Sequence, residues 1–171
     1  MPPEGDSLRG SAVPTGNQAV DAVNIRRACG FDASALAFLA QDHAAFERSV
    51  ASCDAEGLAR ALDAKPPLLF AWVAERTGEP VGYARATVDY STWRATHYVH
   101  LDCLFVVESH RKRGVGGKLI DAIRRYAAER GLRSIEWQTP VWNCQAIQFY
   151  ERFGAERLDK ARFRMDVESG G

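Results

Sequence analysis

A glycine-rich basic segment between two apolar stretches is the part of the sequence best suited to bind an anion. It reads Arg-Lys-Arg-Gly-Val-Gly-Gly-Lys and spans residues 111–118. An apolar, strand-like run precedes it at 99–107, and a helix-like segment follows at 119–128. A strand that passes through such a turn into a helix presents free backbone N–H groups at the positive end of a helix dipole. The segment therefore predicts a binding site for a phosphate-bearing ligand.

Two familiar phosphate-binding motifs do not fit the spacing of this segment. A Walker-type loop needs Gly-x-x-x-x-Gly-Lys followed by Ser or Thr, but Lys118 is followed by Leu119, and Lys112 stands where the first glycine would be. A dinucleotide-binding loop needs Gly-x-Gly-x-x-Gly. The segment begins that pattern at Gly114 but has Leu119 in place of the third glycine. We therefore expect a phosphate-bearing ligand of another class.

A carboxylate lies within the apolar run that precedes the basic segment. Asp102 interrupts this run, where an unpaired charge would be costly, and a functional role is therefore favoured. His100 shares its strand face by two-residue alternation, so the two side chains are expected to flank one pocket. A salt bridge or hydrogen bond within the fold is the alternative for Asp102. For His100, an ordinary hydrogen-bonded histidine is favoured over a catalytic one.

The pattern of apolar residues places these groups among alternating strands and helices. Asp32 and Asp54 are expected to cap two helices that end before residue 66, and later helices follow the basic segment and Asn143. Apolar alternation predicts strands at 23–28, 68–74, 81–88, 96–107, 134–138 and 162–167, with a turn at 78–80. The resulting order, βααβββαβαβ, predicts a mixed α/β protein.

Composition narrows the class of protein. The 171 residues carry 22 basic and 22 acidic side chains, which argues against nucleic acid or an anionic membrane as a partner. Residues 1–20, rich in Gly, Pro and Ser, are expected to be a disordered tail, and residues 21–171 to form one domain. No segment has the length of a membrane span or the pattern of a secretory signal, and the four cysteines lack metal-ligand spacing. We therefore expect a cytoplasmic protein that binds no metal.

Two motifs, in order along the chain, resemble those of the Gcn5-related N-acetyltransferase (GNAT) superfamily. The first is Arg-x-x-Gly-x-Gly after an apolar strand, at 111–116. The second, at 142–155, reads Trp-Asn-Cys-Gln-Ala-Ile-Gln-Phe-Tyr-Glu-Arg-Phe-Gly-Ala and is similar to the C-terminal helix of that family. The resemblance implies acetyl-coenzyme A as the acyl donor. It also implies a central, mostly antiparallel, twisted sheet of about six or seven strands, splayed at its central strand and flanked by about four helices.

The resemblance assigns donor-binding roles along the chain. Backbone amides of residues 113–118 are implied to hold the pyrophosphate, and the strand segment 104–106 is implied to pair with the pantetheine arm and to polarise the thioester carbonyl. Asn143 either caps its helix or bonds a pantetheine amide. The donor-binding residues expected in this way are Leu104, Phe105, Val106, Arg111, Lys112, Arg113, Gly114, Val115, Gly116, Gly117, Lys118, Asn143 and Tyr150.

Two residues are expected to move protons in the reaction. By resemblance, Tyr150 points its hydroxyl at the coenzyme A sulfur and protonates the leaving thiolate, and a phenol with a pKa of about 10 is a competent donor. Packing of its ring at the helix end is the alternative. A primary ammonium has a pKa of about 10.4 and must lose a proton before it attacks. Asp102, acting directly or through water, is the candidate general base.

Within the superfamily, the sequence is most similar to the diamine and thialysine acetyltransferase group. The Phe46-Glu47 pair is similar to an element that lines the acceptor site of that group, whereas Asp102 stands where the group has glutamate and Cys103 replaces a second acid. These two departures remove negative charge that would attract a polycation. The acceptor contacts implied by the resemblance and the surrounding elements are Glu47, Trp93, His100 and Asp102.

These observations predict an acetyl-coenzyme A-dependent N-acetyltransferase. Its acceptor would be the primary amine of a small molecule (a polyamine, an amino acid or an aminoglycoside-like compound), which attacks the thioester directly in a ternary complex. Two alternatives stay open: a protein or peptide acetyltransferase that acts on lysine or an N-terminus, and a non-catalytic sensor that binds acyl-coenzyme A. A homodimer is expected because the resembled group commonly forms one.

Overall fold

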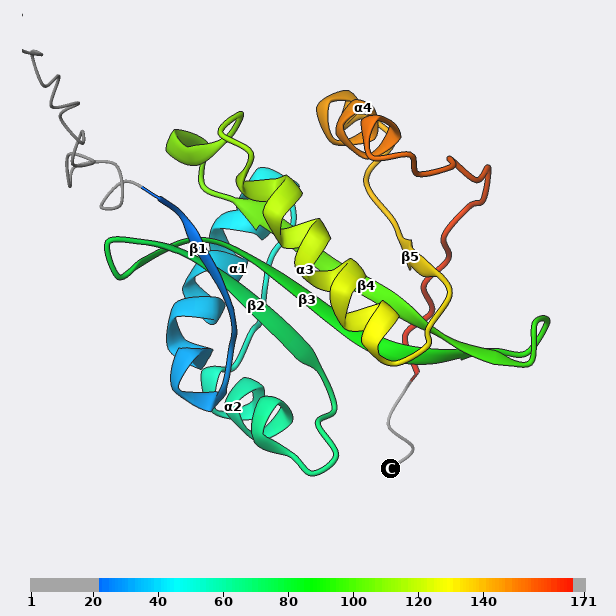
Figure 1. The fold of residues 1–171 in the computed structure, drawn as a ribbon, viewed down its shortest axis with the longest axis horizontal. Coiled ribbons are helices and arrows are strands. Elements are labelled where there is room, and N and C mark those ends of the chain that lie inside the picture. Colours follow the sequence, from blue (N-terminus) through cyan, green and yellow to red (C-terminus); the bar gives the residue numbers. More distant parts are fainter. Residues whose placement is uncertain (1–21, 168–171) are drawn as a thin grey trace, which may run out of the picture. The chain divides into compact units, whose positions relative to one another are not determined.

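The computed structural model describes residues 22–167, which form two compact units divided after Glu136. The predicted tail, residues 1–20, lies outside the described residues, and the single domain at 21–171 stays a prediction. The first unit contains β1 (Asn24–Arg27), α1 (Ala33–Phe46), α2 (Ala55–Asp63), β2 (Phe70–Arg76), β3 (Glu79–Ser91), β4 (Thr96–Val106), α3 (Val115–Glu129) and most of β5 (Ile135–Trp137). Two short 3-10 turns, η1 (Gly30–Asp32) and η2 (Glu108–His110), join these elements, and α4 (Cys144–Arg152) belongs to the second unit (Figure 1).

The sheet has the strand order β1-β2-β3-β4-β5. The first four strands pair antiparallel with their neighbours, and the Val99 N–H of β4 donates to the Ser134 carbonyl just before β5, at 3.0 Å. The turn between β2 and β3 falls at Thr77-Gly78, both with positive φ, and Pro80 lies in β3 rather than in the turn. Such a pair of left-handed residues matches the twist of the flanking strands.

Side chains that alternate along β2 show which helices pack on each face of the sheet. Ala71 and Val73 lie in a buried apolar cluster with side chains of α1 and α2. Phe70 and Trp72 instead contact the ring of Tyr126 in α3, with ring centroids 4.7 and 5.4 Å apart. Because successive strand residues point to opposite faces, α1 and α2 cover one face and α3 the other (Figure 1).

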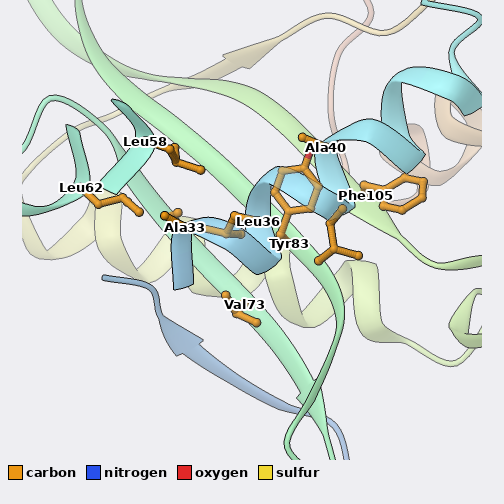
Figure 2. Close-up of a cluster of buried hydrophobic side chains, with 10 residues drawn as sticks. Ala33, Leu36, Ala40, Leu58, Leu62, Val73, Tyr83 and Phe105 are labelled. Carbon is orange, nitrogen blue, oxygen red and sulfur yellow. The ribbon is translucent and has the colours of Figure 1, made fainter. Parts of the chain in front are cut away.

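Figure 2 shows the apolar cluster on the face that α1 and α2 cover. Leu58 and Leu62 of α2 lie at one end of it, whereas Tyr83 and Phe105 lie beside α1 at the other. Tyr83 is fully buried, and its ring is the largest one in the cluster to be so enclosed. The polar side chains of Arg85 and His43 contact Tyr83 at this end of the cluster.

The two predicted helix caps have different outcomes. Asp54 caps α2 as predicted, since its carboxylate accepts from the N–H groups of Glu56 and Gly57 at 3.1 and 2.8 Å. Asp32 precedes α1 but makes no side-chain cap for it. Its carboxylate accepts instead from the Cys29 N–H at 2.9 Å and pairs with Arg26, and it therefore closes η1 rather than α1.

The predicted last strand at 162–167 is wrong. These residues form no strand, and the sheet within residues 22–167 has five strands rather than the six or seven expected. The side chains of Phe163, Met165 and Val167 are about 90% exposed. An alternating pattern produces a strand only where a neighbouring edge can accept its hydrogen bonds, and the sequence pattern cannot show whether such an edge exists.

We predict that Asp54→Ala lowers the free energy of unfolding by about 1 kcal/mol, because two N–H groups of the first turn of α2 lose their acceptor. Denaturant unfolding followed by circular dichroism measures this. Asp121→Ala, on the exposed side of α3, is the matched control and should cost less than about 0.5 kcal/mol. Equal losses in the two variants would contradict the capping role.

Candidate active site

Asp102 is the extra residue of a β-bulge in β4. On β3, Arg85 pairs with Cys103 and the next residue, Ala86, pairs with Leu101, so that Asp102 is skipped in the register. A bulge bends the strand and re-aims the side chains beside it, which is why bulges often border active sites. The bulge therefore sets the local geometry of the segment that precedes the basic loop.

The bulge corrects one expectation about Asp102. The sequence suggested a charge enclosed within an apolar strand, but the residue is exposed. Neighbouring residues of a regular strand point to opposite faces, yet Cys103 Sγ lies 3.4 Å from Asp102 Oδ2. The carboxylate is accordingly hydrated and accessible, as a proton acceptor for a bound molecule must be.

The basic segment forms a turn that ends at the start of α3. Lys112 and Gly114 have positive φ (59° and 78°), and α3 begins at Val115. The first helical hydrogen bond runs from the Lys118 N–H to the Gly114 carbonyl at 3.1 Å, so the N–H groups of residues 115–117 have no carbonyl of an earlier turn to bond. A Cβ at Gly114 would meet no atom within 4 Å, which leaves this turn open to a ligand.

The basic side chains of the segment are arranged differently from one another. Arg111 turns back to the strand: its Nε donates to the Val106 carbonyl at 2.9 Å, and its guanidinium lies over the rings of Phe46 and Phe105 at 4.4 and 5.4 Å. Lys118 Nζ donates to the Val23 carbonyl at 3.1 Å. A hollow of about 180 Å³ is lined by Ala22, Val23, Arg76, His110, Arg113 and Lys118.

The strand segment 104–106 is held firmly by β3 on one side. Leu104, Phe105 and Val106 pair with Ala84, Tyr83 and Gly82 in turn. A Cβ at Gly82 would lie 2.7 Å from the Phe105 carbonyl oxygen, so the two backbones approach more closely there than any other residue would allow. The segment predicted to hold the pantetheine arm is thus fixed from the β3 side.

A buried polar chain that the sequence analysis missed runs from β3 to α1. Arg85 Nη2 donates to the Tyr83 oxygen at 3.4 Å, which leaves the Tyr83 hydroxyl proton for His43 Nδ1 at 3.1 Å. The Nε2–H of His43 then faces Glu47 Oε1 at 3.4 Å, and its ring stacks on Phe105 with centroids 5.0 Å apart. This donor sequence gives the Tyr83 hydroxyl and the His43 Nε2–H an acceptor each.

Burial lowers the pKa of His43, with Glu47 and Asp102 acting in the opposite direction and Arg85 adding to the decrease. Burial also raises the pKa of Tyr83. The sequence carried a usable signal for Arg85, since it is a charge within an apolar strand, as Asp102 is. His43 carried none, because it lies in an ordinary helical pattern 40 residues from its partner Tyr83.

The predicted acceptor residues are only partly brought together. Glu47 Oε1 lies 3.4 Å from His43 Nε2, and His43 lies near enough to Asp102 for the charge of that carboxylate to act on its imidazole. His100 bonds Asp89, with Nδ1 and Oδ2 3.2 Å apart. Trp93 is 96% exposed in the turn between β3 and β4, roughly 20 Å along the strand from Asp102 at about 3.3 Å per residue. The structure therefore does not bring Trp93 to Asp102 within the first unit.

The second unit contains Asn143 and Tyr150. Asn143 caps α4, since its Oδ1 accepts from the Ala146 N–H at 3.1 Å. The ring of Tyr150 contacts those of Trp137 and Phe149 edge-on, with centroids 5.0 and 5.2 Å apart. These contacts fix the ring within its own unit, and the role of the hydroxyl at the coenzyme A sulfur stays a prediction.

Two further findings concern residues 22–167. No helix in this range is long and apolar enough to span a membrane. Nor does this part of the chain gather three or more His, Cys, Asp or Glu side chains into a cluster that could hold a metal ion. All four cysteines are free thiols, and those at positions 53 and 103 are partly buried.

The lowered pKa of His43 predicts a pH-dependent stability. An unfolded imidazole titrates near about 6.5, so below that pH the unfolded chain binds a proton that the folded protein does not. The contribution of neutral His43 to the free energy of unfolding is therefore complete above about pH 6.5, and it is lost as the pH falls toward the pKa of His43 in the folded protein. The free energy of unfolding should therefore fall more steeply on acidification in the wild type than in His43→Asn. The exposed His97→Asn is the control and should keep the wild-type slope; identical slopes in all three proteins would refute the prediction.

Comparisons with known proteins agree with this geometry. The Acetyltransferase (GNAT) family profile matches residues 36–155. The uncharacterized N-acetyltransferase YhfO of Bacillus subtilis (strain 168) is 32% identical over 136 residues, which cover 78% of this chain and 90% of that protein. Thialysine N-epsilon-acetyltransferase of Bos taurus is 29% identical over 110 residues, covering 59% and 64% of the two chains. The solved structure of aminoglycoside N-acetyltransferase AAC(6')-Iy in complex with CoA shares the fold, with a TM-score of 0.73 at 23% identity over 91% of this chain and 99% of that one. The chain therefore belongs to the GNAT family and is an N-acetyltransferase.

Proposed function

We propose that the protein transfers an acetyl group from acetyl-coenzyme A to the primary amine of a small molecule, by direct attack in a ternary complex. The observation that carries this proposal is the open, glycine-containing turn at the start of α3, which η2 connects to a strand with an accessible carboxylate at its bulge. The turn suits a diphosphate, and the carboxylate suits an amine that must lose a proton.

The chain supplies donor-binding groups of two kinds. The N–H groups of residues 115–117, at the positive end of the α3 dipole, are oriented to bond a pyrophosphate, and the exposed Lys112 and Arg113 add charge beside them. Backbone groups of residues 104–106 are proposed to bond the pantetheine arm, with one N–H polarising the thioester carbonyl. Arg111 supports this arrangement indirectly, because its bond to the Val106 carbonyl ties the loop to the end of β4.

Deprotonation of the amine is assigned to Asp102. Its carboxylate is exposed at the bulge, where a substrate ammonium or a bridging water can reach it. Because the carboxylate is exposed, it can release the proton to solvent. The amine nitrogen then attacks the thioester carbonyl carbon, and the carbon–sulfur bond breaks as Tyr150 gives its proton to the departing thiolate. The nitrogen loses its second proton in the same step, and this proton, carried by water, restores the phenol of Tyr150.

The acceptor is proposed to be a small molecule rather than a protein. The bovine relative is named for thialysine, which is a small amine-bearing amino acid. We also propose that the protein is a homodimer, which light scattering of the purified protein would test. A cytoplasmic location stays a proposal.

We predict that the purified protein binds acetyl-coenzyme A in a calorimetric titration and releases thiol when a primary amine is added. The amine panel should include putrescine, spermidine, ornithine, lysine, thialysine, an aminoglycoside and a lysine-containing peptide. Turnover with a free small amine supports the proposal, whereas turnover confined to the peptide favours a protein acetyltransferase. Binding of the donor with no turnover on any amine favours a sensor.

We predict that Tyr150→Phe lowers kcat by about a hundredfold while leaving acetyl-coenzyme A affinity within about threefold, because only the proton for the thiolate is removed. Tyr98→Phe on β4 is the control for loss of a hydroxyl and should retain activity. The acid role is refuted if turnover by Tyr150→Phe is unchanged when the chemical step limits the rate.

A further inference from the structure

A cationic side chain lies partly buried beside Asp102 without a carboxylate partner. The Nη atoms of Arg85 contact Cys53 Sγ at 3.6 Å, Cys103 Sγ at 3.3 Å and the Tyr83 oxygen at 3.4 Å. Its Nε is enclosed and has no hydrogen-bond partner. Within residues 22–167, no Asp or Glu forms an ion pair with this guanidinium.

The neighbours of Arg85 do not supply a negative charge. Burial raises the pKa of the Cys103 thiol and that of the Tyr83 phenol, so both groups are neutral near pH 7. The guanidinium itself stays protonated throughout the physiological range. Taking such a cation out of water is costly unless an anion pairs with it, and neutral sulfur and phenol oxygens compensate it weakly. Arg85 is therefore a charged group whose complementary partner is not among the described residues.

The thiol of Cys103 lies between the Asp102 carboxylate and the Arg85 guanidinium. Cys103 Sγ lies 3.4 Å from Asp102 Oδ2 and 3.3 Å from Arg85 Nη2. The bulge creates this juxtaposition, since it turns Asp102 and Cys103 toward each other. Two opposite charges that form no ion pair with each other thus contact the same thiol.

This pair of charges discriminates between kinds of amine. A polyamine carries ammonium groups only, and the second of these would be repelled by Arg85. A free amino acid carries an ammonium for Asp102 and a carboxylate for Arg85 in one small molecule. A guanidinium binds a carboxylate through two parallel hydrogen bonds, which also fixes the orientation of the bound molecule.

Building on the acetyltransferase function proposed above, we propose that the acyl acceptor is a free amino acid, whose carboxylate is held by Arg85 while Asp102 receives its ammonium. The carboxylate takes the place of the weak sulfur contacts of the guanidinium. Arg85 is thus a residue that determines specificity, and the proton transfer stays with Asp102.

The test compares amino acids with amines that differ only by the loss of the carboxylate. Ornithine is paired with putrescine, lysine with cadaverine, and phenylalanine with phenethylamine. The wild type should show a kcat/KM at least about tenfold higher for the amino acid of the best pair, because its carboxylate pairs with a partly desolvated guanidinium. A wild type that prefers the decarboxylated amine in every pair overturns the proposal.

Two variants connect this preference to the side chain. In Arg85→Met, which keeps the length without the charge, the ratio of kcat/KM for amino acid over amine should fall toward one. Arg85→Lys should keep part of the preference, since it retains a point charge but loses the two-pronged geometry. Arg124→Met, at an exposed position on α3, is the matched control and should keep the wild-type ratio. An unchanged ratio in a folded Arg85→Met overturns the proposal, and Arg85→Lys serves in its place if the methionine variant does not fold.

Direct binding separates this proposal from the enzymatic one. Calorimetric titration of the protein saturated with coenzyme A, which cannot transfer acetyl, measures the affinity for each member of a pair. Tighter binding of the amino acid supports the proposal even where no turnover occurs, and in that case only the proposed reaction has failed. Equal affinities within a pair overturn the role of Arg85, even where the enzyme turns over other amines.

Discussion

The skipped residue in the pairing of β3 with β4 is the constraint on which the rest of the site depends. A regular ladder would place Asp102 and Cys103 on opposite faces of the sheet. With the bulge, Arg85 pairs with Cys103, and the thiol lies between the carboxylate and the guanidinium. The bulge also frees Asp102 from the ladder, which is why the carboxylate is exposed. One additional residue in β4 thereby fixes the positions of the two charges that we propose bind the acceptor.

The turn that we propose binds the donor depends on a different and more local constraint. The left-handed turn at Gly114 starts α3 without a preceding helical turn, and the first N–H groups of the helix consequently have no internal acceptor. The turn is tied back to the strand through Arg111, whose guanidinium bonds the Val106 carbonyl and covers the rings of Phe46 and Phe105. The side chain of Arg111 therefore anchors the loop, while the backbone N–H groups at the start of α3 stay available to a ligand.

The sequence predicted those features that depend on neighbouring residues. The loop, the cap at Asp54 and the helix after Asn143 all follow from residues a few positions apart, and the structure confirms these elements. The bulge follows from pairing between strands, which no pattern within β4 specifies, and the exposure of Asp102 was missed for that reason. His43 was missed because Tyr83, its partner, is distant in the sequence. The strand expected at 162–167 failed because alternation alone cannot provide a neighbouring edge.

One hydrogen-bonded chain joins the core to the residues that we propose bind the acceptor, so the positions of the charged groups there depend on the packing of the core. Tyr83 is enclosed in the cluster beneath α1, where its buried hydroxyl needs hydrogen-bond partners among the neighbouring side chains. Arg85 and His43 are two such partners. If the phenol bonds both, neither side chain is free to turn outward: the guanidinium stays beside Cys103, and the neutral imidazole stays beside Glu47. The packing of the core thus holds a cation in a position where it has no anion of its own, and this is the condition under which a bound carboxylate adds most to selectivity.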